Sequence, residues 1–256
     1  MRIISYNTNG IRSAINKGFI EWLKTDPADI ICIQEIKAEK DNVDYKKLEE
    51  LGFDTYWYSA QKKGYSGVAV FTKIKPDKVE YGTKIEQSDF EGRVIRLDFG
   101  NITLINAYFP SGTSGDERQT YKYQWLDEFY DHLNKLRKTR PRLVITGDYN
   151  IAHKEVDIHD PKGNKKSSGF LPEERAWMDK FLANGFIDTF REVNPDAKDS
   201  YSWWSQRFPT VRLQNKGWRI DYITITENLK GQLADAKIFP HIKHSDHCPI
   251  YAELTV

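Results

Sequence analysis

Leu143-Val144-Ile145-Thr146-Gly147-Asp148-Tyr149-Asn150 is the stretch that decides the fold, because an apolar run stops there at a glycine and polar residues. A continuous apolar run is typical of a strand buried on both faces. Asp29–Ile33 repeats the pattern earlier in the chain, where the run ends at Gln34-Glu35. This repeated pattern predicts two similar halves whose strands share a core between two sheets.

Strand-like runs and amphipathic helices are mixed along the rest of the chain. A helix is predicted from about Glu117 to Leu136, where apolar residues recur at helical spacing. Pro172 opens a second helix that ends at Asn184-Gly185, and Phe19–Leu23 belongs to a shorter one. Further strands are predicted at Arg2–Asn7, Asp54–Ser59, Gly67–Thr72, Arg93–Phe99, Ile102–Phe109, Arg219–Thr226 and Pro249–Val256.

Length and composition limit the class of protein. The 256 residues are 39% hydrophobic and 29% charged, enough for one large domain over residues 1–256. Cys32 and Cys248 are too few for a disulfide framework, and we expect buried free thiols in a reduced, cytoplasmic protein. The chain lacks an apolar run near the roughly 20 residues of a membrane helix, so no membrane partner is expected. A net charge of +1 excludes a uniformly basic DNA-binding surface but allows a local basic face.

Carboxylates, amides and a histidine recur where predicted strands stop, and loops at such a rim often carry function. Each has an ordinary alternative, such as a turn at Asn9-Gly10, a cap at Asp148 or a surface ion pair at Asp246. Asp221 is harder to explain, because it interrupts an apolar strand and needs a buried partner, for which a histidine is the natural choice. The residues of this kind are Asn7, Asn9, Glu35, Asp148, Asn150, Asp221, Asp246 and His247.

The chemistry of these side chains indicates a metal site for phosphoryl transfer. The set is rich in oxygen and lacks the Cys and His spacing of a zinc site. Hard oxygen ligands favour Mg²⁺ or Mn²⁺, and Mg²⁺ is commonly shared between carboxylates and substrate phosphates. A carboxylate can activate water, and amides with a protonated histidine can stabilise charge on a phosphoryl group.

Eight blocks of the sequence, in order and spanning essentially the whole chain, resemble the motifs of the exonuclease III family, the class II apurinic/apyrimidinic (AP) endonucleases. Asn7, Glu35, Gly-Asp-x-Asn and Ser-Asp-His alone would indicate only the wider endonuclease/exonuclease/phosphatase superfamily. The blocks GYSG and GWRIDY, together with GNKK at Gly163–Lys166, narrow the resemblance to the repair nucleases. The eight blocks are Ser5–Arg12 (SYNTNGIR), Ile33–Lys37 (IQEIK), Gly64–Gly67 (GYSG), Glu91–Arg93 (EGR), Tyr108–Pro110 (YFP), Gly147–Asn150 (GDYN), Gly217–Tyr222 (GWRIDY) and Ser245–Pro249 (SDHCP).

The resemblance implies an α/β four-layer sandwich, in which two packed, mostly antiparallel β-sheets are flanked by helices. It also implies a role for each residue at the strand ends. Glu35 would be the main metal ligand, with Asn7, Asn9 and Asp246 around the same metal and phosphate pocket. The catalytic group would comprise Asp148 for the attacking water, Asn150 for the phosphate and water, His247 for the scissile phosphate, Asp221 to orient His247, and Tyr108 near the phosphate or leaving group. Whether Asp148, His247 or a metal-bound water handles the proton stays open at this point.

Recognition of an abasic site must rest on phosphate contacts and on deformation of the duplex, since no base is present to be read. Trp203 and Trp218 resemble the apolar wall against a flipped deoxyribose, whereas core packing is the rival reading for Trp204. The loop Ser205–Gly217 departs from the family in length and in Gln206 and Phe208-Pro209, which puts lesion preference in doubt. The expected DNA contacts are Arg12, Lys37, Tyr65, Asn164, Lys165 and Lys166, and Ser167 replaces a frequent Asn beside them.

The resulting hypothesis is a metal-dependent repair nuclease that hydrolyses the phosphodiester 5′ to an abasic site and leaves a 3′-hydroxyl. A 3′-phosphodiesterase and 3′→5′ exonuclease activity would accompany it. Double-stranded DNA with abasic sites or blocked 3′ ends would be the partner of a monomer. The alternatives are a superfamily phosphoesterase on small substrates and a non-catalytic DNA-binding relative. Retention of Glu35, Asp148, Asn150, Asp221 and His247 argues against the non-catalytic alternative.

Overall fold

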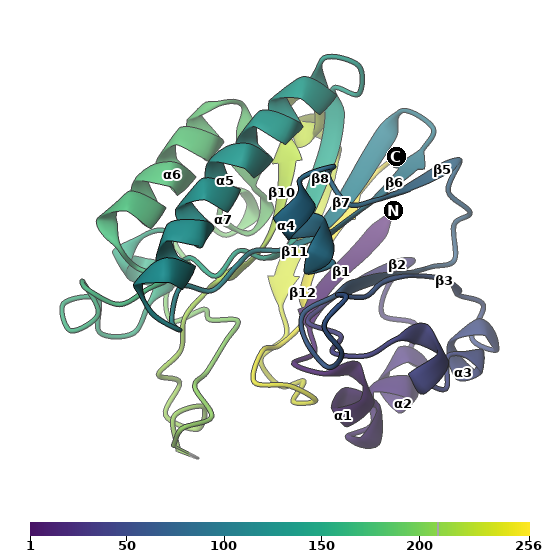
Figure 1. The fold of residues 1–256 in the computed structure, drawn as a ribbon, viewed down its shortest axis with the longest axis horizontal. Helices are drawn as coiled ribbons and strands as arrows, with labels where there is room; N and C mark the ends of the chain where they lie inside the picture. Colours follow the sequence, from purple (N-terminus) through teal and green to yellow (C-terminus); the bar gives the residue numbers. More distant parts are fainter. Residues whose placement is uncertain (209) are drawn as a thin grey trace.

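Two six-stranded sheets packed against each other form the centre of the molecule, in a computed structural model that describes residues 1–208 and 210–256 (Figure 1). The first sheet has the order β11-β12-β1-β2-β4-β3, and the second has the order β5-β6-β7-β8-β10-β9. Their bounds are β1 Arg2–Asn7, β2 Ile30–Gln34, β3 Asp54–Tyr58, β4 Val68–Thr72, β11 Leu233–Ile238 and β12 Ile250–Leu254, then β5 Lys78–Tyr81, β6 Val94–Phe99, β7 Ile102–Tyr108, β8 Arg142–Asp148, β9 Phe186–Asp188 and β10 Asp221–Thr226.

Each sheet contains one parallel pair of strands, β1 with β2 and β7 with β8, and the other pairs are antiparallel. The parallel registers align the carboxyl ends of the paired strands. Asn7 lies opposite Gln34 in the first sheet, and Tyr108 lies opposite Asp148 in the second. Asp221, the first residue of β10, is the partner of Asp148 in the antiparallel direction. The register therefore gathers the polar strand ends at one rim.

Helices cover the outer faces of both sheets, which confirms the predicted four-layer α/β sandwich (Figure 1). The long helices α5 and α6 run side by side over the second sheet, and α1, α2 and α3 lie beside the first. One apolar cluster fills the space between the sheets, and two more fill the spaces beneath the helices. The helices are α1 Ile11–Asn16, α2 Phe19–Leu23, α3 Lys46–Glu49, α4 Glu86–Phe90, α5 Asp116–Arg137, α6 Pro172–Ala183 and α7 Thr189–Val193.

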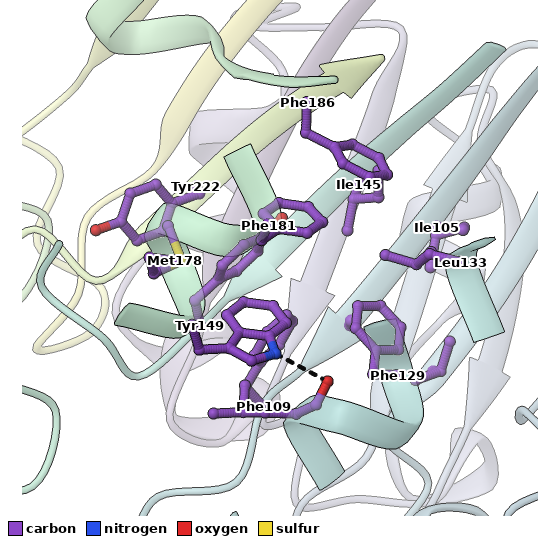
Figure 2. Close-up of a cluster of buried hydrophobic side chains, with 14 of the residues drawn as sticks. Ile105, Phe109, Phe129, Leu133, Ile145, Tyr149, Met178, Phe181, Phe186 and Tyr222 are labelled. Carbon is purple, nitrogen blue, oxygen red and sulfur yellow. Dashed lines mark hydrogen bonds between the residues drawn. The ribbon is translucent and has the colours of Figure 1, made fainter. Parts of the chain in front are cut away.

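The layer beneath α5 and α6 supports the strand end at Asp148. Figure 2 shows the aromatic rings of Phe109, Tyr149 and Phe181 in this layer. Phe109 and Tyr149 stack with ring centroids 4.1 Å apart, and the Tyr149 hydroxyl hydrogen-bonds with Thr224 at 2.8 Å. The residue that follows Asp148 is thus anchored in the core, and this anchor restricts the backbone at the site.

Several short elements were not predicted from the sequence, namely β5, β9, β11, α1, α3, α4 and α7. β5 and β11 carry charged, partly exposed residues, and β9 has three residues, so none offers a continuous apolar run. β3, β5, β9 and β11 are the edges of the two sheets, where charged side chains protect unpaired backbone groups. Among the described residues, no helix combines the length and apolar character needed to cross a bilayer.

Candidate active site

The polar strand ends surround a cavity of about 920 Å³ at the rim of the two sheets. Two strand boundaries differ from the sequence prediction and matter here. β8 runs through Gly147 to Asp148, and β10 begins at Asp221 rather than at Arg219. Asp221 therefore does not interrupt an apolar strand, and it begins β10 beside the cavity. The predicted site residues that line the cavity are Asn9, Glu35, Lys37, Tyr108, Asp148, Asn150, Lys166, Trp203, Trp218, Asp246 and His247.

Asp148 is 1% exposed and is held from both sides by asparagines. The Asn7 side chain donates to Asp148 Oδ2 at 2.8 Å and to Glu35 Oε2 at 3.1 Å. The Asn150 backbone N–H donates to Asp148 Oδ1 at 2.8 Å. Burial and the nearby charge of Asp221 together raise the pKa of Asp148 to about 7, against the opposing effects of His247 and of these hydrogen-bond donors. The carboxyl group is thus close to half-ionised at neutral pH.

His247 lies between Asp221 and Asp148, which confirms the histidine partner predicted for Asp221. His247 Nδ1 donates to Asp221 Oδ2 over 2.9 Å, and Ser202 Oγ donates to the same oxygen at 2.6 Å. His247 Nε2 is 3.8 Å from Asp148 Oδ2. Burial lowers the pKa of His247, but the charges of Asp221 and Asp148 outweigh it and raise that pKa to about 10. The ring is therefore an imidazolium at neutral pH.

A second group of oxygens, at Glu35, Asn9 and Asp246, faces the same cavity. The Lys37 ammonium lies 2.8 Å from Glu35 Oε1 and donates to Asn9 Oδ1 at 2.6 Å. The Asn9 side chain donates to Asp246 Oδ1 at 3.0 Å, and Trp203 Nε1 donates to Asp246 Oδ2 at 3.1 Å. The Lys37 ammonium already bridges two of these oxygens, one of Glu35 and one of Asn9. A set of oxygen ligands that holds a cation in this way fits a small hard metal ion.

Asp148, Asp221 and His247 form another possible ligand group, since one ligand atom of each lies within 4.8 Å of the others. His247 Nδ1 and Asp221 Oδ2 are already hydrogen-bonded to each other. A protonated imidazole is also no ligand until it loses its proton. The Glu35 group needs only displacement of the Lys37 ammonium, and it is the better metal site on this chemistry.

Tyr108 ends β7, directly beside Asp148. Burial raises the pKa of its phenol well above the ordinary value, and the charges of Glu35 and Asp148 act in the same direction, so the group is a neutral donor. The Arg93 guanidinium lies 4.9 Å from the centre of the Tyr108 ring and donates to its carbonyl oxygen at 2.7 Å. No role was predicted for Arg93 from the sequence, although its EGR motif was the available signal.

Tyr65 is held outside the cavity by a network of charged side chains. Arg118 makes two 2.7 Å hydrogen bonds to the Glu91 carboxylate and donates to the Tyr65 hydroxyl at 3.0 Å. Arg93 Nε donates to the same Glu91 carboxylate at 2.5 Å. Arg118, like Arg93, was missed from the sequence, and a charged residue on a long helix has no distinctive local signal.

Trp203 and Trp218 form one wall of the cavity, with a T-shaped contact between ring centroids 5.9 Å apart. Trp204 is 2% exposed, which confirms the core-packing alternative for that residue. Arg207 also lines the cavity, so the loop Ser205–Gly217 borders it as expected. Within the predicted pair Phe208-Pro209, Phe208 is exposed and Pro209 lies outside the described residues.

The expected DNA contacts divide between the cavity and the surface around it. Arg12 and Lys165 are exposed and do not line the cavity, whereas Lys166 and Ser167 do. The Asn164 amide donates to two backbone carbonyls of its own turn, and Asn164 Oδ1 accepts from Ser167 Oγ at 3.1 Å. Asn164 thus stabilises the turn that presents Lys166 rather than offering a free amide. Both cysteines are buried free thiols, as expected.

The chain matches the model of the endonuclease/exonuclease/phosphatase family over residues 4–247. It is 43% identical to an exodeoxyribonuclease of Bacillus subtilis, with 98% of each chain covered. It is 40% identical to the DNA repair nuclease APEX1 of Danio rerio, with 100% of this chain and 83% of that protein covered. The solved structure of an AP endonuclease from Archaeoglobus fulgidus is 31% identical and superposes with a TM-score of 0.89, with both chains covered completely. With this sequence, this fold and this set of strand-end residues, the chain belongs to the endonuclease/exonuclease/phosphatase family.

Proposed function

We propose that this chain is a divalent-metal-dependent DNA repair nuclease that hydrolyses the phosphodiester 5′ to an abasic site. The observation that carries the proposal is the meeting of two groups at one cavity. An oxygen-rich cation site at Glu35 faces the buried Asp148, His247 and Asp221 cluster, and a wall of two tryptophans stands beside them. Relatives named as exodeoxyribonuclease and DNA repair nuclease support a nucleic-acid substrate.

Glu35, Asn9 and Asp246 would hold the metal, with Asn7 as the hydrogen-bonded link between Glu35 and Asp148. Mg²⁺ or Mn²⁺ bound there would supply positive charge to the phosphate oxygens as the reaction proceeds. Lys37 would have to leave Glu35 for a cation to bind there, and it would then be free to contact a phosphate. Lys37 would thus have two positions, one on Glu35 in the metal-free protein and one on a phosphate of bound DNA.

Asp148 is the proposed general base for the attacking water. Its pKa of about 7 provides a carboxylate in useful amounts at neutral pH and an acceptor strong enough to take a proton. The water oxygen forms a bond to phosphorus and its proton moves to Asp148. The bond from phosphorus to O3′ breaks, and O3′ leaves with the bonding electron pair and takes a proton from solvent to become the 3′-hydroxyl. Asp221 and Asp148 raise the pKa of His247, so we assign it the role of a protonated donor to a phosphoryl oxygen rather than that of the base.

Tyr108 and Asn150 complete the phosphate pocket as neutral donors. The Tyr108 phenol keeps its proton because burial raises its pKa. The Asn150 amide donates to the Phe109 carbonyl at 2.9 Å and to Asp148 Oδ2 at 3.3 Å, and a substrate phosphate would replace Asp148 as the acceptor of the second hydrogen. Donors held in this way stabilise charge that develops in the transition state without reorganising during the reaction.

Duplex DNA with an abasic site or a blocked 3′ end is the proposed substrate. The flipped sugar would pack against Trp203 and Trp218, because an abasic nucleotide leaves the stack at low cost. Lys165, Lys166, Arg12 and Tyr65 would contact phosphates on either side of the cavity. We further propose a cytoplasmic monomer formed by one domain over residues 1–256, with no membrane partner.

The test is cleavage of a 5′-labelled duplex that carries one internal tetrahydrofuran analogue of an abasic site, with Mg²⁺, with Mn²⁺ and with EDTA. One metal-dependent product that ends on the 5′ side of the analogue is expected. A ladder that shortens from the 3′ end without that product would replace the proposal with an exonuclease. Hydrolysis of a small phosphodiester with no cleavage of DNA would favour the small-substrate alternative.

A further inference from the structure

A lysine and a glutamate lie completely buried beneath the cavity. Lys122 on α5 and Glu174 on α6 are both 0% exposed, and Lys122 Nζ lies 2.5 Å from Glu174 Oε1. The lysine also donates to the backbone carbonyl of Asn150 at 2.8 Å. Burial lowers the pKa of Lys122, and the charge of Glu174 opposes that shift. The buried pair therefore hydrogen-bonds to the backbone of Asn150, a proposed active-site residue.

Glu174 extends the pair to the wall of the cavity. Its Oε2 accepts from the backbone N–H of Gly169 at 2.6 Å and of Leu171 at 2.9 Å. The Gln119 side chain donates to Glu174 Oε1 at 3.1 Å. Gly169, Leu171 and Gln119 all line the cavity. One buried ion pair thus connects Asn150, the 169–171 segment and the long helix α5.

Asn150 has a backbone that needs such support. Its φ is 53°, in the left-handed region that side chains other than glycine seldom adopt. This conformation turns the Asn150 amide toward Phe109 and Asp148, and it turns the Asn150 carbonyl toward Lys122. A strained conformation persists when its surroundings determine it strongly, and an ammonium fixed on the carbonyl does so.

Stability alone does not account for the pair. A buried ion pair pays a large desolvation cost, and well-packed apolar residues in its place are often as stable or more stable. Polar pairs of this kind are instead distinguished by directional hydrogen bonds, which apolar side chains cannot make. Here every one of those bonds ends on a residue of the cavity or on its neighbouring backbone.

We infer that Lys122 and Glu174 are positioning residues, which hold the Asn150 amide and the 169–171 wall in the geometry that the phosphate requires. The inference rests on the proposed function for the identity of the reaction. It adds a pair of residues to that reaction, neither of which touches the substrate. The pair acts through the peptide group of Asn150 and through the backbone of the wall.

The principal test is the double variant Lys122→Met with Glu174→Met, which removes both charges and leaves neither unpaired. The expected result is a kcat on the abasic-analogue duplex that falls roughly 10²-fold, because displacement of a positioned group by about 1 Å has that effect. KM is expected to stay close to that of the wild type, and Tm is expected to fall, because the Gly169 and Leu171 N–H groups lose their acceptor. An unchanged kcat would overturn the inference.

A double-mutant cycle separates positioning from a general loss of structure. If the pair acts through Asn150, the Met/Met substitution loses most of its effect on kcat in an Asn150→Ala background. If the two effects multiply in full, the pair does not act through Asn150 and the inference is wrong. Lys122→Gln with Glu174→Gln, a neutral pair that still hydrogen-bonds, is expected to recover part of the lost kcat and covers the case in which the Met/Met protein fails to fold.

The matched control is Lys230→Met with Glu192→Met. That Lys–Glu pair is linked at 2.8 Å on the surface and does not line the cavity, so its removal should leave kcat unchanged. The NMR signals of the Asn150 side-chain amide provide a readout without activity. They should shift in the Met/Met protein and not in the control. This readout holds even if the wild type fails to cut DNA, so failure of the inference and failure of the proposed function can be told apart.

Discussion

Two buried acidic clusters lie close together in the sequence and behave in opposite ways. In the candidate active site, Asp148 and Asp221 share one histidine, and the pKa of Asp148 is raised to about 7. Asp157 is equally buried, but it hydrogen-bonds to Arg219 Nε at 2.8 Å and to Arg191 Nη2 at 2.6 Å. Burial raises its pKa too, yet the two arginines outweigh burial and lower that pKa to about 2.

The difference teaches that the kind of cation, and not burial, decides what a buried carboxylate does. Arginine keeps its charge at every relevant pH, so Asp157 remains a fixed anion in a structural network. Arg219 also reaches Asp188 at 2.7 Å and so ties β10 to β9. A single imidazolium cannot balance both Asp148 and Asp221, and the unbalanced carboxyl group is left ready to exchange a proton.

Asp148→Asn carries the largest expected effect. We expect kcat on the abasic-analogue duplex to fall by about 10²–10⁴-fold, because an amide cannot accept the proton of the attacking water. DNA affinity should stay near the wild-type value, since the role is confined to the transition state. Single-turnover kinetics with a separate binding titration give both quantities. A parallel loss of affinity would show that Asp148 is structural and would break the contrast with Asp157.

Asp157→Asn should show the reverse pattern. Removal of this negative charge leaves the buried guanidinium of Arg219 facing a neutral amide, which should lower the free energy of unfolding by about 3–5 kcal/mol. The kcat of the folded fraction should change little, because neither Asp157 nor Arg219 lines the cavity. Urea unfolding and activity at low temperature provide the two measurements. A loss of kcat with unchanged stability would mean that this cluster also belongs to the reaction.

Glu35→Gln tests whether the carboxylate of Glu35 binds the metal ion. Loss of one carboxylate should weaken Mg²⁺ binding by about 10–100-fold, the range for changes around a metal site. The measurement is the Mg²⁺ concentration at half-maximal activity, supported by calorimetry on the protein alone. Asp235, a partly exposed acid on β11 that does not line the cavity, offers a control in Asp235→Asn. An unchanged Mg²⁺ titration would remove Glu35 from the metal site.

The smallest expected effect is on Tm in the metal-free protein. The Asp148 and Asp157 carboxyl groups should change Tm in opposite directions as the pH rises. The folded pKa of Asp157 is about 2, below its unfolded value of 3.8, so its stabilisation is complete above 3.8 and is lost as the pH falls toward 2. The folded pKa of Asp148 is about 7, so ionisation costs stability as the pH rises from 3.8 to 7. At pH 8, Asp148→Asn should therefore raise Tm and Asp157→Asn should lower it, and both differences should shrink in acid. Calorimetric scans at several pH values would check the signs, and equal signs would contradict the comparison.

The sequence alone was sufficient for the fold class and for the rim at which the site lies. Apolar runs such as those of β2 and β8 can be buried only inside a sheet, and polar residues at their ends must then meet at its rim. The motif order added the family and, with it, the four-layer sandwich and a role for each residue at the strand ends. The short edge elements β5, β9 and β11 could not be predicted, because pairing with a neighbour rather than their own composition holds them in place.

Only the tertiary structure decided the charges and the supports of the site. Asn7 and Asp148 are 141 residues apart in sequence, and Lys122 and Glu174 are 52 apart, yet each pair is in hydrogen-bond contact. The protonation of His247 depends on two carboxylates from β8 and β10, which no local pattern reports. Sequence determines which chemical groups a strand delivers to the rim. Electrostatic energies depend on the distances between those groups and on their burial, and both exist only once the chain has folded.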